Sequence, residues 1–318
     1  MKTTLNSLEL KLKTIEITKF IIRILIGGLF ILTATLKLFS LDQFELYVYS
    51  FGIFNYLSVT VLVRLLIAFE LLMGIFLIAK IYYKPVWWLT MASLAGFTLL
   101  LIYVAIFRND TNCHCFGDFV ELDPAKSIIK NVITMILLLL IYKEKDYRFK
   151  FKKWVAGGAF VLAILIPFAV FPMDAIYNQF VDPHGPINSK MFDKMRTDTT
   201  LTNMQIDSGN YAVGIFFSQC KYCKLSIEKV NSIIERQGLD KSHIKICISG
   251  NEESINKFKE ETKAIDYTYN KISPILALNI TYGKFPMFIL IKDGKIVNTM
   301  DLRGIDEQEL AKFLPKKQ

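Results

Sequence analysis

The stretch YAVGIFFSQCKYCKLSIEKVNSIIERQG, from Tyr211 to Gly238, decides the fold of the carboxy-terminal half. Its first seven residues are apolar and suit a buried strand. Apolar residues then recur at roughly helical spacing over 225–234, and the closing glycine can end the helix. Cys220 is therefore expected at the junction of a strand and a helix, with Cys223 in the first helical turn. Exposed amide hydrogens and the helix dipole stabilise an anion there, so the sequence predicts a favoured thiolate at Cys220.

Further elements follow in the order strand, helix, hairpin, helix. HIKICIS (His243–Ser249) predicts a second buried strand, and a charged helical stretch follows at about 252–263. PMFILIKDGKIVNTM, over 286–300, predicts two strands joined by a tight turn. An amphipathic helix over 306–314 closes the chain.

With its C-x-x-C helix and Phe285-Pro286 before the hairpin, this half resembles a thioredoxin-like domain over roughly 200–318. The resemblance implies a cis peptide bond at Pro286, next to the active cysteines, where a backbone edge could pair with a substrate strand. Gln219 and the Lys-Tyr dipeptide between Cys220 and Cys223 depart from the family pattern. Because these positions tune the reduction potential, the direction of electron flow stays open.

Two other interpretations of these cysteines are a passive disulfide and half of a zinc site. No second C-x-x-C or histidine pair is present to complete a zinc tetrahedron, so neither is favoured. Cys247 alternates with isoleucines in a probable central strand and is expected to be a buried, inert thiol.

The amino-terminal half is apolar enough to be a membrane domain. Hydrophobic residues make up 53% of the 318 residues, charged ones 21%, and the mean hydropathy is +0.36. Five apolar stretches approach or reach the length of a membrane-spanning helix, and the fourth is short. They are Phe20–Phe39, Leu57–Ala79, Val86–Phe107, Ser127–Tyr142 and Trp154–Pro172.

The net charge of +9 is a topology signal, and it does not indicate nucleic-acid binding. Residues 1–173 carry +7 of it and residues 174–318 carry +2. Twelve of the lysines and arginines lie before the first span and in the second and fourth connections, whereas the first and third connections hold two. The positive-inside rule puts the amino terminus in the cytoplasm and everything after the fifth span outside. Both close cysteine pairs would then face an oxidising compartment.

The expected domains are a four-helix membrane domain (1–145), a basic loop with a fifth anchoring helix (146–173), a tether (174–205) and an extracytoplasmic α/β domain (206–318). GGLFILTATLKLF in the first span, FELLMG in the second and Asn112-Cys-His-Cys-Phe-Gly117 together resemble the MauE/DoxX family over about 18–145. The resemblance implies a role in disulfide formation or electron delivery outside the cytoplasm, or, in one branch, in maturation of methylamine dehydrogenase.

Cys113 and Cys115 allow three interpretations. A turn can bring residues i and i+2 within disulfide reach only with strain, and such a bond is a good oxidant that could exchange with Cys220. Cys113, His114 and Cys115 could instead bind copper(I). The third interpretation is a structural loop in which Phe116 and Gly117 fix a turn. His114 could assist proton transfer during exchange or be a bystander.

Three of the ionisable residues within the spans are candidates for a site. Glu70 lies deep in the second span, Arg64 lies nearer the outer end of that span, and Lys37 lies near the outer end of the first span. Such groups usually face a bundle interior and find a partner, so we expect Glu70 to pair with Arg64 or Lys37, in a functional or a structural role. Lys37 could also snorkel to the interface.

These observations favour a membrane-anchored thiol:disulfide oxidoreductase of the bacterial cytoplasmic membrane. Cys220 would attack, Cys223 would resolve the mixed disulfide, Pro286 would dock the partner, and Cys113 and Cys115 would relay electrons. The expected partners are the lipid bilayer and extracytoplasmic thiol or disulfide client proteins. No metal is expected, and a quinone is the candidate cofactor. The alternative is a non-enzymatic assembly or maturation factor that binds a client or a metal.

Overall fold

The computed structural model describes residues 2–108, 112–113, 115–120, 122–147, 150–198, 201–202 and 204–317, with only the backbone described at 2–12 and 118. The chain divides into two compact units. One comprises Met1–Tyr47 with Thr60–Pro172, and the other comprises Val48–Val59 with Met173–Gln318.

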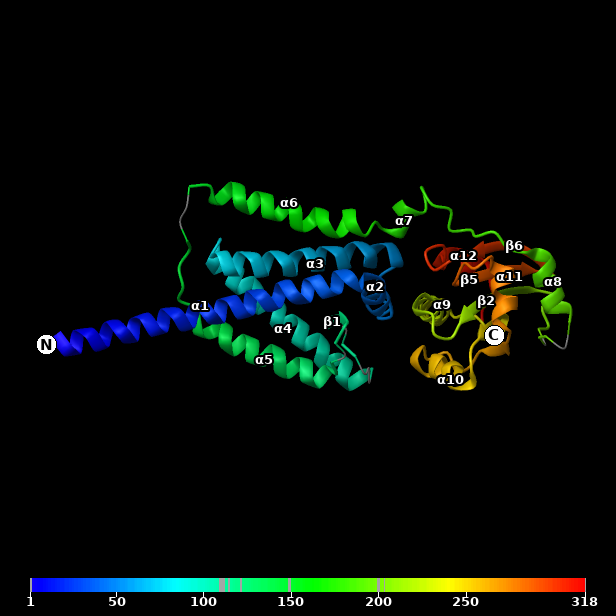
Figure 1. The fold of residues 1–318 in the computed structure, drawn as a ribbon, viewed down its shortest axis with the longest axis horizontal. Helices are drawn as coiled ribbons and strands as arrows, with labels where there is room; N and C mark the ends of the chain where they lie inside the picture. The colour runs from blue at the N-terminus through cyan, green and yellow to red at the C-terminus, as the bar shows by residue number, and fades with distance from the viewer. Residues whose placement is uncertain are drawn as a thin grey trace. The chain divides into compact units, whose positions relative to one another are not determined.

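The amino-terminal half is helical (Figure 1). Four of its helices are long and apolar enough to cross a membrane, over Lys13–Phe39, Tyr56–Ala79, Tyr83–Phe107 and Lys152–Val170 of the described residues. The helix in the fourth apolar stretch has 17 residues, so it is short, as its sequence indicates. The elements are α1 (Lys2–Phe39), α2 (Leu41–Tyr49), α3 (Tyr56–Ala79), α4 (Tyr83–Phe107), β1 (Cys115–Asp118), α5 (Pro124–Leu140) and α6 (Lys152–Val170).

Glycines allow α1 and α3 to approach closely. A Cβ added at Gly74 would lie 2.6 Å from the carbonyl oxygen of Gly27, and one at Gly27 would lie 2.8 Å from the carbonyl oxygen of Gly74. Small residues are the usual means by which helices in a membrane bring their backbones together. On the same two helices, Lys37 follows Gly27 in α1 and Glu70 precedes Gly74 in α3.

Side chains of α4 complete the hydrogen bonding at the end of α5. Trp87 donates from Nε1 to the carbonyl of Leu138 at 2.8 Å, and the Tyr83 hydroxyl donates to the carbonyl of Ile141 at 2.7 Å. Both carbonyls also accept from backbone amides, those of Ile141 and Glu144 at 3.2 Å, so each side chain of α4 adds a second hydrogen bond where α5 ends.

The carboxy-terminal half is a mixed domain of helices and one five-stranded sheet. The strand order is β4-β3-β2-β5-β6; β2, β3 and β4 are parallel, and β5 and β6 are antiparallel to their neighbours. The strands are β2 (Asn210–Phe217), β3 (Ile244–Ser249), β4 (Thr268–Lys271), β5 (Met287–Lys292) and β6 (Lys295–Met300). The helices are α7 (Asp174–Tyr177), α8 (Ser189–Thr197), α9 (Lys221–Gln237), η1 (Lys241–His243), α10 (Glu252–Glu261), α11 (Pro274–Thr281) and α12 (Glu307–Phe313).

The central strand β2 is buried on both faces. On one face Val213 and Ile215 pack in a core with residues of α8 and α11. On the other face the ring of Phe216 contacts those of Phe258 in α10 and Phe288 in β5. Such burial explains why β2 is a continuous apolar run without alternation.

The structure changes one expected boundary. Residues 174–205 are expected to be a tether, but they contain α8, whose Phe192 and Met195 are fully buried in the core beside the sheet. Asn188 caps the helix by accepting a hydrogen bond from the amide of Met191. The folded domain therefore begins before residue 206. The helix was not predicted because it is short and follows a stretch that contains proline and glycine.

Candidate functional site

Cys220 and Cys223 lie at the start of α9, as the sequence predicts. Cys220 is the N-cap residue, and its Sγ accepts a hydrogen bond from the amide of Cys223 at 3.3 Å. Cys220 is partly exposed, whereas Cys223 is fully buried. One sulfur is thus accessible to a partner, and the other is held behind it.

The two thiols have opposite acidities. A hydrogen bond from Cys223 lowers the pKa of Cys220 to about 6, against the opposing effect of burial, and backbone amides of the first turn and Lys224 add to the lowering. Burial raises the pKa of Cys223 far above its ordinary value. The Lys224 ammonium also binds Glu261 at 2.5 Å. At neutral pH Cys220 is a thiolate and Cys223 a thiol.

Pro286 lies at the same end of the sheet's strands as Cys220. The peptide bond between Phe285 and Pro286 is cis, as the family resemblance implies. Met287, the first residue of β5, pairs with Ile215 near the end of β2. The Phe285 ring contacts the Phe217 ring, with centroids 4.5 Å apart. The end of β2 that leads to Cys220 and the start of β5 that follows Pro286 are therefore neighbours.

Cys247 is fully buried, and its thiol donates to Sδ of Met204 at 3.5 Å. Burial raises its pKa to about 12. This agrees with the expected inert thiol.

The second cysteine pair forms a disulfide. Cys113 and Cys115 are bonded, with α-carbons 5.3 Å apart, and are 1% and 2% exposed. The Ser127 hydroxyl lies 3.0 Å from Sγ of Cys113 and is the donor, because a disulfide sulfur carries no proton. While the bond is closed neither sulfur is a thiolate that could ligate copper(I). His114 lies outside the described residues.

Gly117 lets β1 lie against the end of α1. Its φ is +61°, and an added Cβ would lie 1.9 Å from the Ser40 hydroxyl oxygen and 2.8 Å from the carbonyl oxygen of Leu36. Both the left-handed backbone and the close approach require glycine. The C-F-G residues thus hold the disulfide against the bundle.

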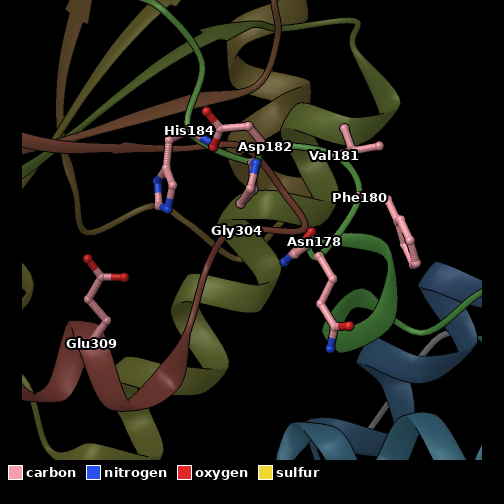
Figure 2. Close-up of a pocket in the computed structure, with 9 residues that line it drawn as sticks. Asn178, Phe180, Val181, Asp182, His184, Gly304 and Glu309 are labelled. Carbon is pink, nitrogen blue, oxygen red and sulfur yellow. The ribbon is translucent and has the colours of Figure 1, made fainter.

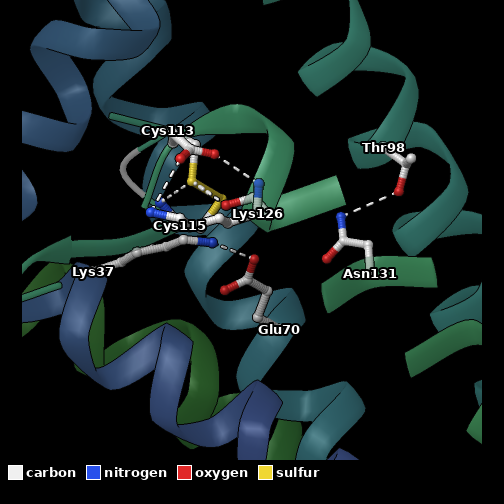
Figure 3. The surroundings of a disulfide bond; sticks show 9 residues. Lys37, Glu70, Thr98, Cys113, Cys115, Lys126 and Asn131 are labelled. Atoms are coloured by element: carbon white, nitrogen blue, oxygen red, sulfur yellow. Dashed lines mark hydrogen bonds and ion pairs between the residues drawn. A yellow bond between two sulfur atoms is a disulfide. The ribbon is translucent and has the colours of Figure 1, made fainter. Parts of the chain in front are cut away.

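A cavity of about 60 Å³, lined by both polar and apolar side chains, lies next to the disulfide within the bundle. Lys37, 2% exposed, donates to Oε1 of Glu70 at 2.5 Å, and the two residues lie near Cys113 and Cys115 in Figure 3. Oε2 of Glu70 is buried and accepts no hydrogen bond from the described residues. The cavity lining is Leu29, Phe30, Thr33, Lys37, Leu66, Phe69, Glu70, Ser93, Leu94, Phe97, Cys115, Lys130 and Asn131.

The structure selects one of the two expected partners of Glu70. Lys37 pairs with it and does not snorkel. The pairing of Arg64 with Glu70 is wrong, because the Arg64 guanidinium binds Glu45 of α2 and the carbonyl of Phe171. Glu70 and Arg64 are six residues apart, which is not a spacing that places two side chains on one face of a helix.

Sequence reasoning missed Glu45, Lys130 and Asn131. All three lie within or beside apolar stretches, so the rule that singled out Glu70 could have found them. Asn131 is 1% exposed and donates to the Thr98 hydroxyl at 3.2 Å.

A larger, open hollow of about 580 Å³ lies in the carboxy-terminal unit (Figure 2). It contains none of the predicted site residues. His184 is turned to the carbonyl of Thr299, 2.6 Å from Nδ1. Among the described residues, no three histidine, cysteine, aspartate or glutamate side chains group as metal ligands. The lining is Asn178, Gln179, Phe180, Val181, Asp182, Pro183, His184, Gly304 and Glu309.

Two comparisons with known proteins found similarities to this chain. The model of the family described as methylamine utilisation protein MauE matches residues 15–143. Protein TlpB of Flavobacterium psychrophilum is 29% identical over 215 residues, which cover 61% of this chain. This chain spans 57% of the length of that relative. No solved structure matches the chain. Residues 15–143, which hold the disulfide and the cavity, are a MauE-like membrane domain.

Proposed function

We propose that this chain is a membrane-anchored thiol:disulfide oxidoreductase with a thioredoxin-like carboxy-terminal domain. The observation that carries the proposal is the contrast between Cys220 and Cys223. A partly exposed thiolate stands at the cap of α9, and a buried thiol follows one turn later. This is the arrangement that a two-step exchange requires.

The exchange is balanced within the two pairs of sulfurs. The Cys220 thiolate attacks one sulfur of a client disulfide, forming a mixed disulfide, and the other client sulfur leaves as a thiolate. That thiolate takes the proton of Cys223, whose sulfur attacks Cys220 and releases the second client thiolate. Two electrons pass from Cys220 and Cys223 to the client, and the reverse sequence oxidises a dithiol.

In this proposal Pro286 docks the client beside Cys220, and the Cys113–Cys115 disulfide exchanges with the Cys220 pair. The positive-inside count supports an extracytoplasmic site in a bacterial cytoplasmic membrane. When the exchange runs in the direction that oxidises a client dithiol, a quinone would be the final electron acceptor. Cys113 and Cys115 are nearly fully buried. Attack on their disulfide therefore requires a local movement that exposes one of the two sulfurs.

Trapping tests the exchange. In cells that express the full chain, Cys223→Ser should accumulate mixed disulfides of Cys220 with clients or with Cys113 or Cys115, and these should disappear on reduction. Cys247→Ser is the matched control and should trap nothing. Recovery of only unlinked Cys223→Ser protein, after acid quenching, would contradict the proposal.

Labelling tests the orientation. A membrane-impermeant maleimide should modify Cys220 from outside the cytoplasmic membrane after mild reduction. Protection of Cys220 in sealed, right-side-out preparations, with labelling in inverted ones, would overturn the proposed topology.

The burial of Cys113 and Cys115 favours a second candidate function, an assembly or maturation factor whose disulfide is structural. In that case the membrane domain would bind its client without thiol chemistry. Client capture by a Cys220→Ala, Cys223→Ala protein at the wild-type level would favour this function over the oxidoreductase.

A further inference from the structure

The cavity beside the bundle disulfide carries a net positive charge. Its ionisable lining residues, among those the structure describes, are Lys37, Lys130 and Glu70. With all three charged, the lining has two ammonium groups and one carboxylate. The closed disulfide adds no charge, so the oxidised cavity holds one excess positive charge in a low-dielectric region.

Each ammonium is held in place. Lys37 Nζ lies 2.5 Å from Glu70 Oε1 and faces the rings of Phe44 and Phe97, at 5.2 and 5.4 Å from their centroids. Lys130 Nζ lies 5.0 Å from the centroid of the ring of Phe116, the residue that follows Cys115. Aromatic faces stabilise cations, most strongly where water is excluded.

Two other charged side chains that the structure describes near the disulfide, Lys126 and Asp123, pair with each other at 3.3 Å and are exposed. Sγ of Cys113 accepts a hydrogen bond from the neutral Ser127 hydroxyl. Of the two cysteines, Cys115 lines the cavity. The charges of the cavity are therefore placed beside Cys115.

We propose that Lys37, Lys130 and Glu70 form a counter-charge site that stabilises Cys115 as the thiolate leaving group when the bundle disulfide is opened. An incoming thiolate bonds to Sγ of Cys113, the bond between the two bundle sulfurs breaks, and its electron pair leaves on Sγ of Cys115. No proton is needed in this step. The new negative charge cancels the excess positive charge of the cavity, and about 60 Å³ leaves room for water beside it.

The site deepens the proposed function, since it presumes that a thiol opens the bundle disulfide. It also assigns separate roles to the two cysteines. Cys113 is the sulfur attacked, and Cys115 is the sulfur released. Lys37, Lys130 and Glu70 act through Cys115 and are positioning residues.

The test is the acidity of Cys115 in the reduced full chain. The protein is placed in lipid nanodiscs with Cys220→Ser and Cys223→Ser, reduced with a phosphine, and alkylated with iodoacetamide at a series of pH values. Peptide mass spectrometry then gives the midpoint of the Cys115 reaction. Because the other pair is absent, the result does not depend on exchange between the two pairs.

The expected shifts have opposite signs. Lys37→Gln and Lys130→Gln should each raise the midpoint by about 1 pH unit, a tenfold loss of rate near neutrality, since each removes a positive charge. Glu70→Gln should lower it by a similar amount. Lys37→Gln and Glu70→Gln break the same ion pair, so a purely structural effect would move both midpoints in the same direction.

The matched control is Glu45→Gln, which breaks the other buried ion pair of the bundle, with Arg64, away from the cavity lining. It should leave the Cys115 midpoint unchanged. Equal midpoints in all variants, or shifts of one sign for Lys37→Gln and Glu70→Gln, would overturn the proposal. If Lys37→Gln does not fold, Lys130→Gln and Glu70→Gln decide the question. If the opposite shifts appear but Cys223→Ser traps no bundle cysteine, the counter-charge site stands and the relay fails.

Discussion

The amide of Cys223 donates a hydrogen bond to Sγ of Cys220 within the first turn of α9. One backbone group thereby ties the buried cysteine to the exposed one and favours negative charge on the latter. The contact depends on the strand-to-helix junction, so the fold supplies the reactivity of Cys220 before any partner binds.

The first prediction concerns the pH dependence of Cys220. Since its pKa is lowered to about 6, alkylation of the reduced full chain by iodoacetamide should reach half its maximal rate near pH 6 and change little above pH 7. Cys247, buried and with its pKa raised to about 12, should react only after unfolding. A Cys220 midpoint near 8.5, the value of an ordinary cysteine, would contradict the prediction.

The second prediction concerns the crossing of α1 and α3. Gly74→Ala places a Cβ against the backbone of Gly27 and should lower the melting temperature by roughly 2–10 °C, the effect of overpacking by 1–3 kcal/mol. All three tryptophans lie in the membrane half, so their fluorescence reports its unfolding alone. Gly28→Ala, with nothing within 4 Å of the added Cβ, is the control and should not lower it. Equal melting of the two variants would show that the close approach is unimportant.

The third prediction concerns Gly117. Gly117 has a φ of +61°, and a Cβ there would meet its neighbours, whereas nothing lies within 4 Å of a Cβ at Gly28. Gly117→Ala should cost clearly more than the strain of a left-handed residue, about 1–2 kcal/mol, and Gly28→Ala, the control in the same unit, should cost little. The readout is again tryptophan fluorescence on heating, together with the fraction of Cys113 and Cys115 found oxidised. Equal melting of Gly117→Ala and Gly28→Ala would argue against close packing of β1 on α1.

The fourth prediction concerns the helix inside the expected tether. Phe192→Ala removes a fully buried ring from the core and should destabilise the carboxy-terminal unit by about 3–5 kcal/mol. Labelling of Cys247, which lies in the same core cluster, at increasing urea concentration measures this unfolding in the full chain. Phe180→Ala, at a residue 83% exposed, should stay within about 0.5 kcal/mol of the wild type. Identical urea midpoints for the two variants would show that α8 does not contribute to the core and belongs to the tether.

The local features of this chain could be predicted because local patterns determine them. The strand before Cys220 and the helix that Gly238 ends follow from hydrophobic spacing and from the left-handed conformation of that glycine. The turn at Asp293 and Gly294 between β5 and β6 likewise follows from residues that tolerate positive φ. The apolar stretches gave the places of all five predicted spanning helices.

Long-range partners could not be predicted in the same way. Arg64 binds Glu45 on another helix, 19 positions earlier, and no spacing rule connects residues on different elements. Strand β4 and helix α11 were also missed, since each is short and its burial depends on the sheet beside it. The cavity at Cys115 could not be predicted either, because five separate elements, α1, α3, α4, β1 and α5, contribute to its lining.

Arg64 has a further consequence for the last membrane helix. Its guanidinium donates to the carbonyl of Phe171 from Nε and Nη2, at 3.1 and 2.8 Å, and binds Glu45 as well. Only 17% of the apolar stretch of α6 is buried against the rest of the protein, so we expect lipid to cover most of that helix. Few apolar contacts would keep it beside α3. Arg64 therefore fixes the end of α6 to α3. Without this side chain, α6 would be free to diffuse and rotate within the bilayer as far as its connecting segments allow.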